Sequence, residues 1–153
     1  MTEHDFDTII RSGTVVHAGG TGRADIGIRG GRIAEIAEHI DARAQTEIDA
    51  DGLLVLPGGV DTHCHIEQIS GAGLLNADTF ETATRSAAMG GTTSVVSFAA
   101  QHPGNRMATV VKDYAALARK GALIDYAFHM IVADTKDGNL THDIPSLITE
   151  GHR

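Results

Sequence analysis

Residues 56–65 read LPGGVDTHCH, a stretch in which Pro-Gly-Gly precedes two histidines separated by one residue. Side chains two residues apart in a β-strand project from the same face, so His63 and His65 point together while Cys64 points to the opposite face. Two imidazoles on one side of a strand end form half of a metal site with nitrogen ligands. A bare His-X-His is more often a pair of hydrogen-bonded histidines. The preceding Pro-Gly-Gly-Val-Asp, and the position at the start of a βα series, favour the metal site here.

From Pro57 onward, strand-like and helix-like segments alternate. Short β-branched and apolar runs predict buried strands, and amphipathic segments that end at glycines predict helices. The predicted strands are residues 60–66, 92–98 and 124–132, and the predicted helices are 78–89, 105–120 and 144–150. This order predicts a parallel sheet with right-handed crossovers. A self-contained open α/β sheet is the alternative, but it normally has more strands and gives the first third of the chain no role.

The residues before Pro57 are predicted to form β-structure. The predicted strands are residues 6–11, 14–17, 25–29, 32–37 and 47–56. Ser12-Gly13 separates the first two as a natural turn pair, and Gly30-Gly31 joins the third and fourth in a hairpin. We therefore predict two domains, a β-rich portion over residues 1–56 and a βα portion over residues 57–153.

Charge and composition narrow the class of protein. The 153 residues carry a formal net charge of −8 and a single cysteine. The acidic balance argues against binding to nucleic acid or to an anionic membrane surface. No apolar run approaches the roughly 20 residues that span a bilayer, and residues 1–7 lack the apolar segment of a secretory signal. One cysteine cannot form an internal disulfide, so we expect a cytoplasmic protein.

The motif at residues 57–65 resembles the strand P-G-x-[IV]-D-x-H-x-H that opens the barrel of the amidohydrolase superfamily. Residues 76–80 (NADTF) and 90–93 (GGTT) are similar to a helix and the second strand of its hydantoinase and dihydropyrimidinase branch. The resemblance extends over essentially the whole chain. It implies an α/β fold in which an N-terminal β-sandwich portion precedes the first three βα units of a (β/α)₈ TIM-type barrel, which this chain leaves incomplete.

The resemblance also implies a reaction, the metal-dependent hydrolysis of a C–N bond in a cyclic amide such as a hydantoin or a dihydropyrimidine. It implies two zinc ions, or other divalent cations, with His63 and His65 as ligands of the more buried one, and a homo-oligomeric full-length protein. The family's bridging carboxylated lysine, its further histidines and its aspartate general base lie on later strands, and no residue here matches them. We therefore expect no catalytic residue in this chain and no activity of the 153 residues alone.

Two alternatives stay open for the function. The first is another substrate of the same superfamily, such as an allantoin-type ureide or the substrate of an aminohydrolase. The second is a truncated, non-catalytic product that acts only in assembly. A dihydroorotase-like protein is disfavoured, because those relatives carry an arginine two places after the second histidine and this chain has Ile66-Glu67 after His65.

Five other residues in or next to the predicted strands could line a pocket, cap a turn or pack in the core. Gln101 and His102 follow the second predicted strand of the βα portion and are candidates for lining the pocket, with an ordinary loop as the alternative. His129 is predicted to be a hydrogen-bonded core residue, and Asp134 a cap of the next turn. Cys64 is predicted to be a packed thiol, because no base accompanies it as a nucleophile would require.

Overall fold

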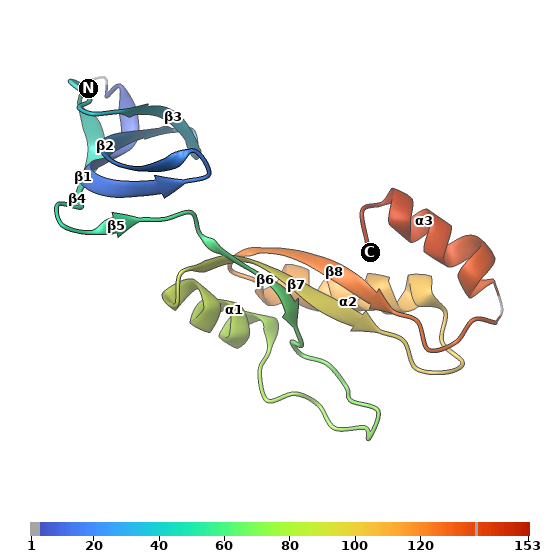
Figure 1. Cartoon of the computed structure of the whole chain (residues 1–153). Helices are drawn as coiled ribbons and strands as arrows, with labels where there is room; N and C mark the ends of the chain where they lie inside the picture. Colours follow the sequence, from blue (N-terminus) through green and yellow to red (C-terminus); the bar gives the residue numbers. More distant parts are fainter. Residues whose placement is uncertain (1–3, 137) are drawn as a thin grey trace. The chain divides into compact units, whose positions relative to one another are not determined.

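The structure is a computed structural model that describes residues 4–136 and 138–153 (Figure 1). It divides into two compact units, Met1–Pro57 and Gly58–Arg153, whereas the sequence pattern placed the boundary between residues 56 and 57. The first unit contains β1 (Phe6–His17), β2 (Gly20–Arg29), β3 (Arg32–Ala37), β4 (Ala44–Asp49) and β5 (Leu54–Val55). The second contains β6 (Gly59–Cys64), α1 (Phe80–Met89), β7 (Thr92–Ala100), α2 (Met107–Gly121), β8 (Asp125–Ile131), the π-helical turn η1 (Asn139–Asp143) and α3 (Ile144–Thr149).

The first unit is a sheet in the order β3-β2-β1-β4, with β5 also beside β1. Gly30 and Gly31 have φ angles of 58° and 71°, and they join β2 to β3 as predicted. The predicted turn at Ser12-Gly13 is wrong, because β1 runs through both residues. Ser12 instead takes a φ of 61° at a bulge, after which pairing with β2 resumes at Gly13.

Asp25 holds this bulge in place from β2. Only 2% of its surface is exposed. Its carboxylate accepts hydrogen bonds from the backbone N–H of Ser12 at 2.7 Å and of Ile40 at 3.1 Å, and from the Arg11 guanidinium at 3.1 Å. Burial alone would raise the pKa of Asp25, but these three donors outweigh it and the pKa is lowered. The carboxylate therefore joins three segments of the first unit.

We predict that Asp25→Ala destabilises the first unit by about 3 kcal/mol, because two backbone N–H groups and a guanidinium lose their acceptor. Urea unfolding followed by far-UV circular dichroism measures the loss. Asp51→Ala is the matched control. It breaks only the exposed ion pair with Arg23, so it should cost about 0–1 kcal/mol. Because the pKa of Asp25 is lowered, its stabilisation is present above the unfolded value of about 3.9 and fades as the pH falls below it. Equal losses in the two variants would contradict this role of Asp25.

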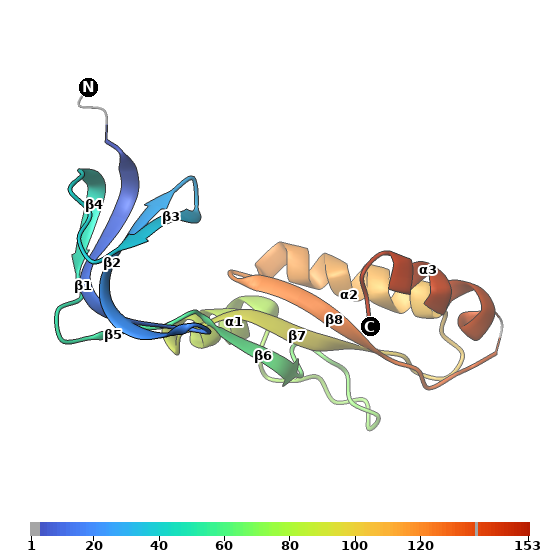
Figure 2. The ribbon, with the colours of Figure 1, turned by 45° about the horizontal axis from the view of Figure 1, so that its top comes forward.

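The second unit is a parallel sheet in the order β6-β7-β8, with α1 and α2 on one face (Figures 1 and 2). The predicted alternation of strands and helices is confirmed, with ends that agree or shift by one or two residues; η1 was not predicted. The core lies between sheet and helices. It consists of Ile66, Phe80, Val95, Ala99, Met107, Val111, Tyr114, Ala118, Phe128 and Leu147.

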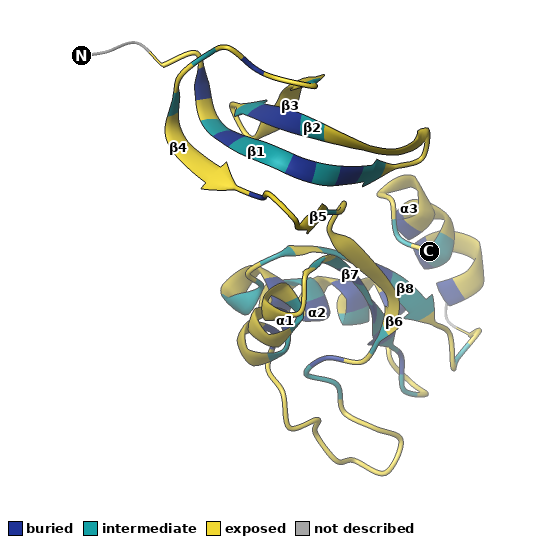
Figure 3. Ribbon diagram, turned by 60° about the vertical axis from the view of Figure 1, so that its left-hand side comes forward, coloured by how far each residue is buried: buried dark blue, intermediate teal, exposed yellow. Residues whose placement is uncertain are grey.

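The strand that carries the histidines is not buried, which corrects the expectation from its apolar pattern. Val60 in β6 is 61% exposed, and Figure 3 shows β6 as exposed along most of its length. The reason lies in the layering. In the described residues the helices cover one face of this sheet, and alternate residues of β7 such as Val95 and Ala99 bury against them. The side chains on the other face of the sheet stay open.

Gly58 explains why the chain enters β6 through a pair of glycines. A Cβ atom at this position would lie 2.1 Å from the hydroxyl oxygen of Thr93 at the start of β7. Gly59 then donates its backbone N–H to the carbonyl of Gly91 at 2.8 Å and begins the parallel pairing. The close approach of these two strand starts sets the register with which β6 delivers His63 to its far end.

Candidate metal site and adjoining cavity

His63 is the last but one residue of β6, and His65 follows the strand directly. Their ring centroids are 5.4 Å apart, and both rings contact the Phe98 ring of β7, at centroid distances of 4.6 and 4.9 Å. Cys64, between them, packs against the core on the helix side. The i, i+2 pattern therefore brings the two imidazoles together on the open face, at the carboxyl end of the strand.

The spacing of the two rings fits joint binding of one cation. Two imidazoles on one tetrahedral zinc, with Zn–N bonds of about 2.0–2.1 Å, have ring centroids roughly 5 Å apart. Within the described residues, neither ring nitrogen of His63 has a hydrogen-bond partner, and His65 uses only Nδ1. No third His, Cys, Asp or Glu joins them in that part of the chain. The pair can thus supply two nitrogen ligands and no more.

The backbone around His65 is fixed by two buried hydroxyl groups. The Ser97 hydroxyl accepts from the Ile66 N–H at 3.3 Å and contacts the Cys64 carbonyl at 3.1 Å. The Tyr114 hydroxyl lies 2.7 Å from that of Ser97 and donates to the Ile66 carbonyl. Burial raises the pKa of Tyr114 to about 12, so this donor keeps its proton throughout the neutral range. Peptide groups on both sides of His65 are therefore held from β7 and α2.

A cavity of about 510 Å³ adjoins His65 at the carboxyl ends of the three strands. Its volume lies within the usual range for small-molecule pockets, roughly 300–1,000 Å³. The lining includes Ile69 and Asn76 from the segment after β6, and Ile131 from the end of β8. Ligand sites of parallel α/β folds lie at this end of the strands. The cavity is therefore the place where a substrate would meet a cation on the histidine pair.

Gln101 and His102, predicted to line the pocket, both border this cavity. The amide of Gln101 is occupied by the backbone: its Oε1 accepts from the N–H groups of Ala133 and Asp134 at 2.9 and 2.8 Å, and its Nε2 donates to the Asn105 carbonyl at 2.8 Å. Gln101 thus ties the loop after β7 to the loop after β8. His102 has no such bonds in the described residues, and it is the freer of the two for contact with a ligand.

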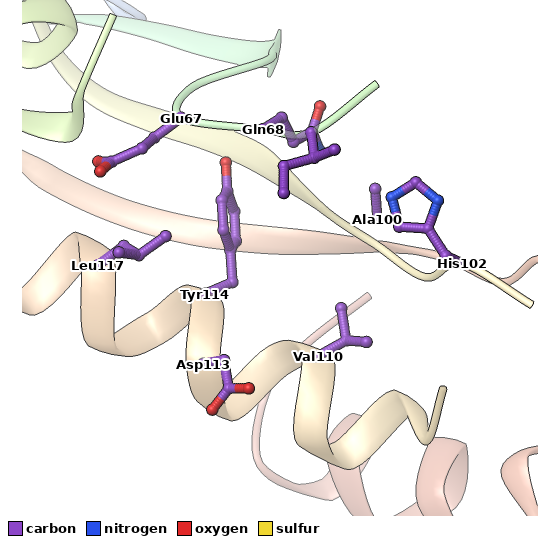
Figure 4. A pocket seen from close by; sticks show the side chains of 9 residues that line it. Glu67, Gln68, Ala100, His102, Val110, Asp113, Tyr114 and Leu117 are labelled. Carbon is purple, nitrogen blue, oxygen red and sulfur yellow. The ribbon is translucent and has the colours of Figure 1, made fainter. Parts of the chain in front are cut away.

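A smaller cavity of about 220 Å³ lies between α2 and the segment that follows β6 (Figure 4). Val110, Asp113, Tyr114 and Leu117 of α2 form one wall, and Glu67, Gln68, Ala100 and His102 are among the residues opposite. Figure 4 shows the Tyr114 hydroxyl pointing toward the segment that carries Glu67 and Gln68. The histidine pair does not border this space, so we assign no chemistry to it.

Three further residues received roles from the sequence: His129, Asp134 and Cys64. The prediction that His129 lies in the core is wrong. His129 is half-buried on the open face, paired in register with Phe98 and 5.2 Å from its ring. Asp134 accepts from the N–H groups of Gly104 and Lys136 at 2.9 and 3.0 Å, in agreement with its predicted role as a cap. Cys64 is a packed thiol, whose pKa is raised by burial and by the charge of Asp61.

Three residues that support the pair were not predicted from the sequence. The Phe98 ring packs against both imidazoles. Ser97 and Tyr114 form hydrogen bonds with the backbone on either side of His65. Their own patterns are those of an apolar strand and an amphipathic helix, so no local signal marks them. Gln68, which contacts His65, was also missed; its position three residues after a candidate ligand, at the start of a loop, was the signal available.

Known proteins that resemble this chain in sequence and in structure include hydantoinases and a dihydropyrimidinase. The chain is 44% identical over 132 residues to a D-hydantoinase of Ralstonia pickettii, covering 86% of this chain and 28% of that protein. It is 42% identical over 149 residues to a D-hydantoinase of Streptomyces coelicolor, covering 94% and 32%. The crystal structure of a dihydropyrimidinase from Brevibacillus agri matches 95% of this chain and 31% of that one, with 37% identity and a TM-score of 0.87.

The chain therefore spans about 30% of the length of the relatives it matches. No protein-family profile matches it. In the described residues, every helix is too short or too polar to cross a membrane.

Proposed function

Because the chain belongs to the hydantoinase and dihydropyrimidinase branch of the amidohydrolase superfamily, as an N-terminal portion of it, we propose that it supplies the first two metal ligands of a cyclic amide hydrolase. The observation that carries the proposal is the placement of His63 and His65. Their rings share one face at the carboxyl end of β6, 5.4 Å apart, beside a cavity of about 510 Å³. The reaction is the hydrolytic opening of a hydantoin or dihydropyrimidine ring to an N-carbamoyl acid.

The residues of this chain have separate tasks in that reaction. His63 and His65 hold a divalent cation, zinc in the first instance. When bound, such a cation polarises the amide carbonyl and lowers the pKa of a coordinated water. Ile69 and Ile131 offer apolar contacts to the substrate ring, and His102 faces it from the end of β7. The general base and the remaining ligands come from outside these residues, so the 153 residues alone do not turn over substrate.

The architecture proposed for the complete enzyme follows the same relatives. We assign the β6-β7-β8 sheet, with its helices, to the start of a (β/α)₈ barrel, and the first unit to part of a β-sandwich. Similarity to a hydantoinase structure over 93% of the chain and to a dihydropyrimidinase structure over 95% supports both assignments. A barrel would also cover the open face of β6, because the inner faces of its strands pack against one another. We further propose a cytoplasmic homo-oligomer.

A chimera tests the proposed function. This chain replaces the matching 32% of the Streptomyces coelicolor D-hydantoinase, and hydantoin ring opening is measured with zinc and after chelation. We expect metal-dependent turnover by the chimera and none by the 153 residues alone. Alanine at both His63 and His65 should reduce turnover strongly. The expected loss exceeds the roughly 10- to 100-fold that follows when a residue that only orients a metal ligand is replaced.

The control is a chimera with alanine at His4 and His17, two histidines of the first unit, which should keep its turnover. Turnover that survives loss of His63 and His65 would overturn the assignment. Opening of ureides, but not of hydantoins or dihydropyrimidines, would favour the alternative substrate class.

A further inference from the structure

Gln68 is the residue whose side chain contacts His65 most directly. Its amide oxygen Oε1 lies 2.6 Å from His65 Nδ1, and its amide nitrogen Nε2 donates to the carbonyl of Phe98. Its backbone N–H donates to Asn76 Oδ1 at 2.8 Å, and its carbonyl accepts from the Asn76 N–H at 3.0 Å. Gln68 is thus held by partners on three segments: the end of β6, the strand β7, and the loop before α1.

These contacts fix which nitrogen of His65 carries the proton. The Phe98 carbonyl can only accept a hydrogen bond, so the NH₂ group of the Gln68 amide must face it. The amide oxygen must then face His65, and because that oxygen can only accept, His65 Nδ1 must be the donor. A neutral imidazole has one N–H, so the lone pair of His65 lies on Nε2.

The other edge of the His65 ring is left for a ligand. In the part of the chain that the structure describes, Nε2 has no hydrogen-bond partner. The ring stacks on Phe98 at an interplanar angle of 15° and meets His63 edge-on at 71°. Stacking from Phe98 and the hydrogen bond from Gln68 together restrict both the tilt and the rotation of the ring.

We propose that Gln68 is a positioning residue of the metal site, which holds His65 as the Nδ1–H tautomer with the Nε2 lone pair presented to the cation. The proposal rests on the proposed metal-dependent function and adds to it a residue that is not itself a ligand. Partners of this kind orient metal-bound histidines and raise their basicity, and their loss typically lowers metal affinity by about 10- to 100-fold.

The backbone before Gln68 is shaped to put its side chain there. Glu67 has a φ of 48°, an uncommon value for a residue other than glycine, and its carboxylate accepts from the N–H of Phe80 at 2.9 Å at the start of α1. Ile66 is buried in the core, and its peptide is held by Ser97 and Tyr114. One tight bend therefore caps α1 with Glu67 and turns Gln68 back toward His65.

The tautomer can be read directly by ¹⁵N NMR of histidine-labelled protein, without metal, at a pH where His65 is neutral. His65→Gln assigns the signals. In the 153-residue chain we expect His65 to be protonated on Nδ1, whereas an unconstrained histidine favours Nε2. In Gln68→Met, which keeps the length of the side chain but cannot accept the bond, the proton should move toward Nε2 and zinc affinity should fall by about 10-fold or more. Gln68→Glu, which can still accept from Nδ1, should keep the Nδ1–H form.

Gln45→Met, at an exposed position of β4, is the matched control and should change neither readout. Tyrosine fluorescence reports whether each variant folds, because both tyrosines lie in the second unit. An Nε2–H tautomer of His65 in the unaltered chain would overturn the proposal without any variant. So would a folded Gln68→Met that keeps both tautomer and affinity. If replacement of His63 and His65 by alanine leaves the zinc affinity unchanged, the proposed function is refuted, whatever the tautomer of His65.

Discussion

Replacement of both His63 and His65 by alanine should lower the zinc affinity of the 153-residue chain by more than about 100-fold, because outer-shell partners alone account for about 10- to 100-fold. The two rings are the part of the described chain that offers paired nitrogens to one cation, 5.4 Å apart and free of competing bonds at His63 and at His65 Nε2. Each single substitution should cause most of the loss, since one imidazole binds a cation weakly.

Competition with a chromophoric chelator measures this affinity. The matched control is alanine at both His4 and His17, two exposed histidines of the first unit. This variant should keep the zinc affinity of the unaltered chain. Cys64→Ser should also leave it unchanged, because that thiol packs on the helix side of β6 and its raised pKa disfavours the thiolate. Equal losses in the histidine pair and in its control would mean that zinc binds to surface histidines at random.

Phe80→Ala should destabilise the second unit by about 3–5 kcal/mol, the usual cost of removing a large buried aromatic side chain. Phe80 is fully buried, and its ring meets those of Tyr114 at 5.2 Å, Tyr126 at 6.3 Å and Phe128 at 6.4 Å. It therefore joins α1 to α2 and to β8. A small domain has a total stability of about 5–15 kcal/mol, so the loss should unfold a large fraction of the unit in mild urea.

Tyrosine fluorescence during urea unfolding measures this loss without a contribution from the first unit, since both tyrosines neighbour Phe80 and the chain has no tryptophan. Met89→Ala is the matched control on the same helix. Met89 is 85% exposed, so its truncation should change stability by no more than about 0.5 kcal/mol. A loss below about 1 kcal/mol in Phe80→Ala would mean that the packing of α1 on the sheet is not what holds the unit together.

The elements that could be predicted from the sequence are those whose cause is local. The strand and helix order after Pro57 follows from side-chain periodicity, and the Gly30-Gly31 hairpin from two residues that accept positive φ. The shared face of His63 and His65 follows from strand geometry. In each case the residues that determine the structure are neighbours in the chain, so one sequence is sufficient.

The failures have causes at a distance. Ser12-Gly13 has the composition of a turn, but the Asp25 carboxylate of β2 accepts from the Ser12 N–H and Gly13 pairs with Ala24 of β2, so the two residues form a bulge within one strand. β6 reads as a buried strand although the described residues cover only one face of its sheet. Gln68 is held toward His65 by its hydrogen bond to the Phe98 carbonyl, 30 residues away. Tyr114 holds the Ile66 carbonyl, beside His65, from 48 residues away. Periodicity carries no information about such contacts.

Zinc X-ray absorption of the 153-residue chain, loaded with one equivalent of zinc, tests the central claim most directly. The claim is that His63 and His65 are the metal ligands of this chain. It predicts a first shell of nitrogen and oxygen at about 2.0–2.1 Å, with the outer-shell scattering of two imidazoles and no sulfur at about 2.3 Å. In the variant with alanine at both His63 and His65, that imidazole scattering should disappear. A shell that contains sulfur, or one that keeps its imidazoles in this variant, would contradict the assignment of the site.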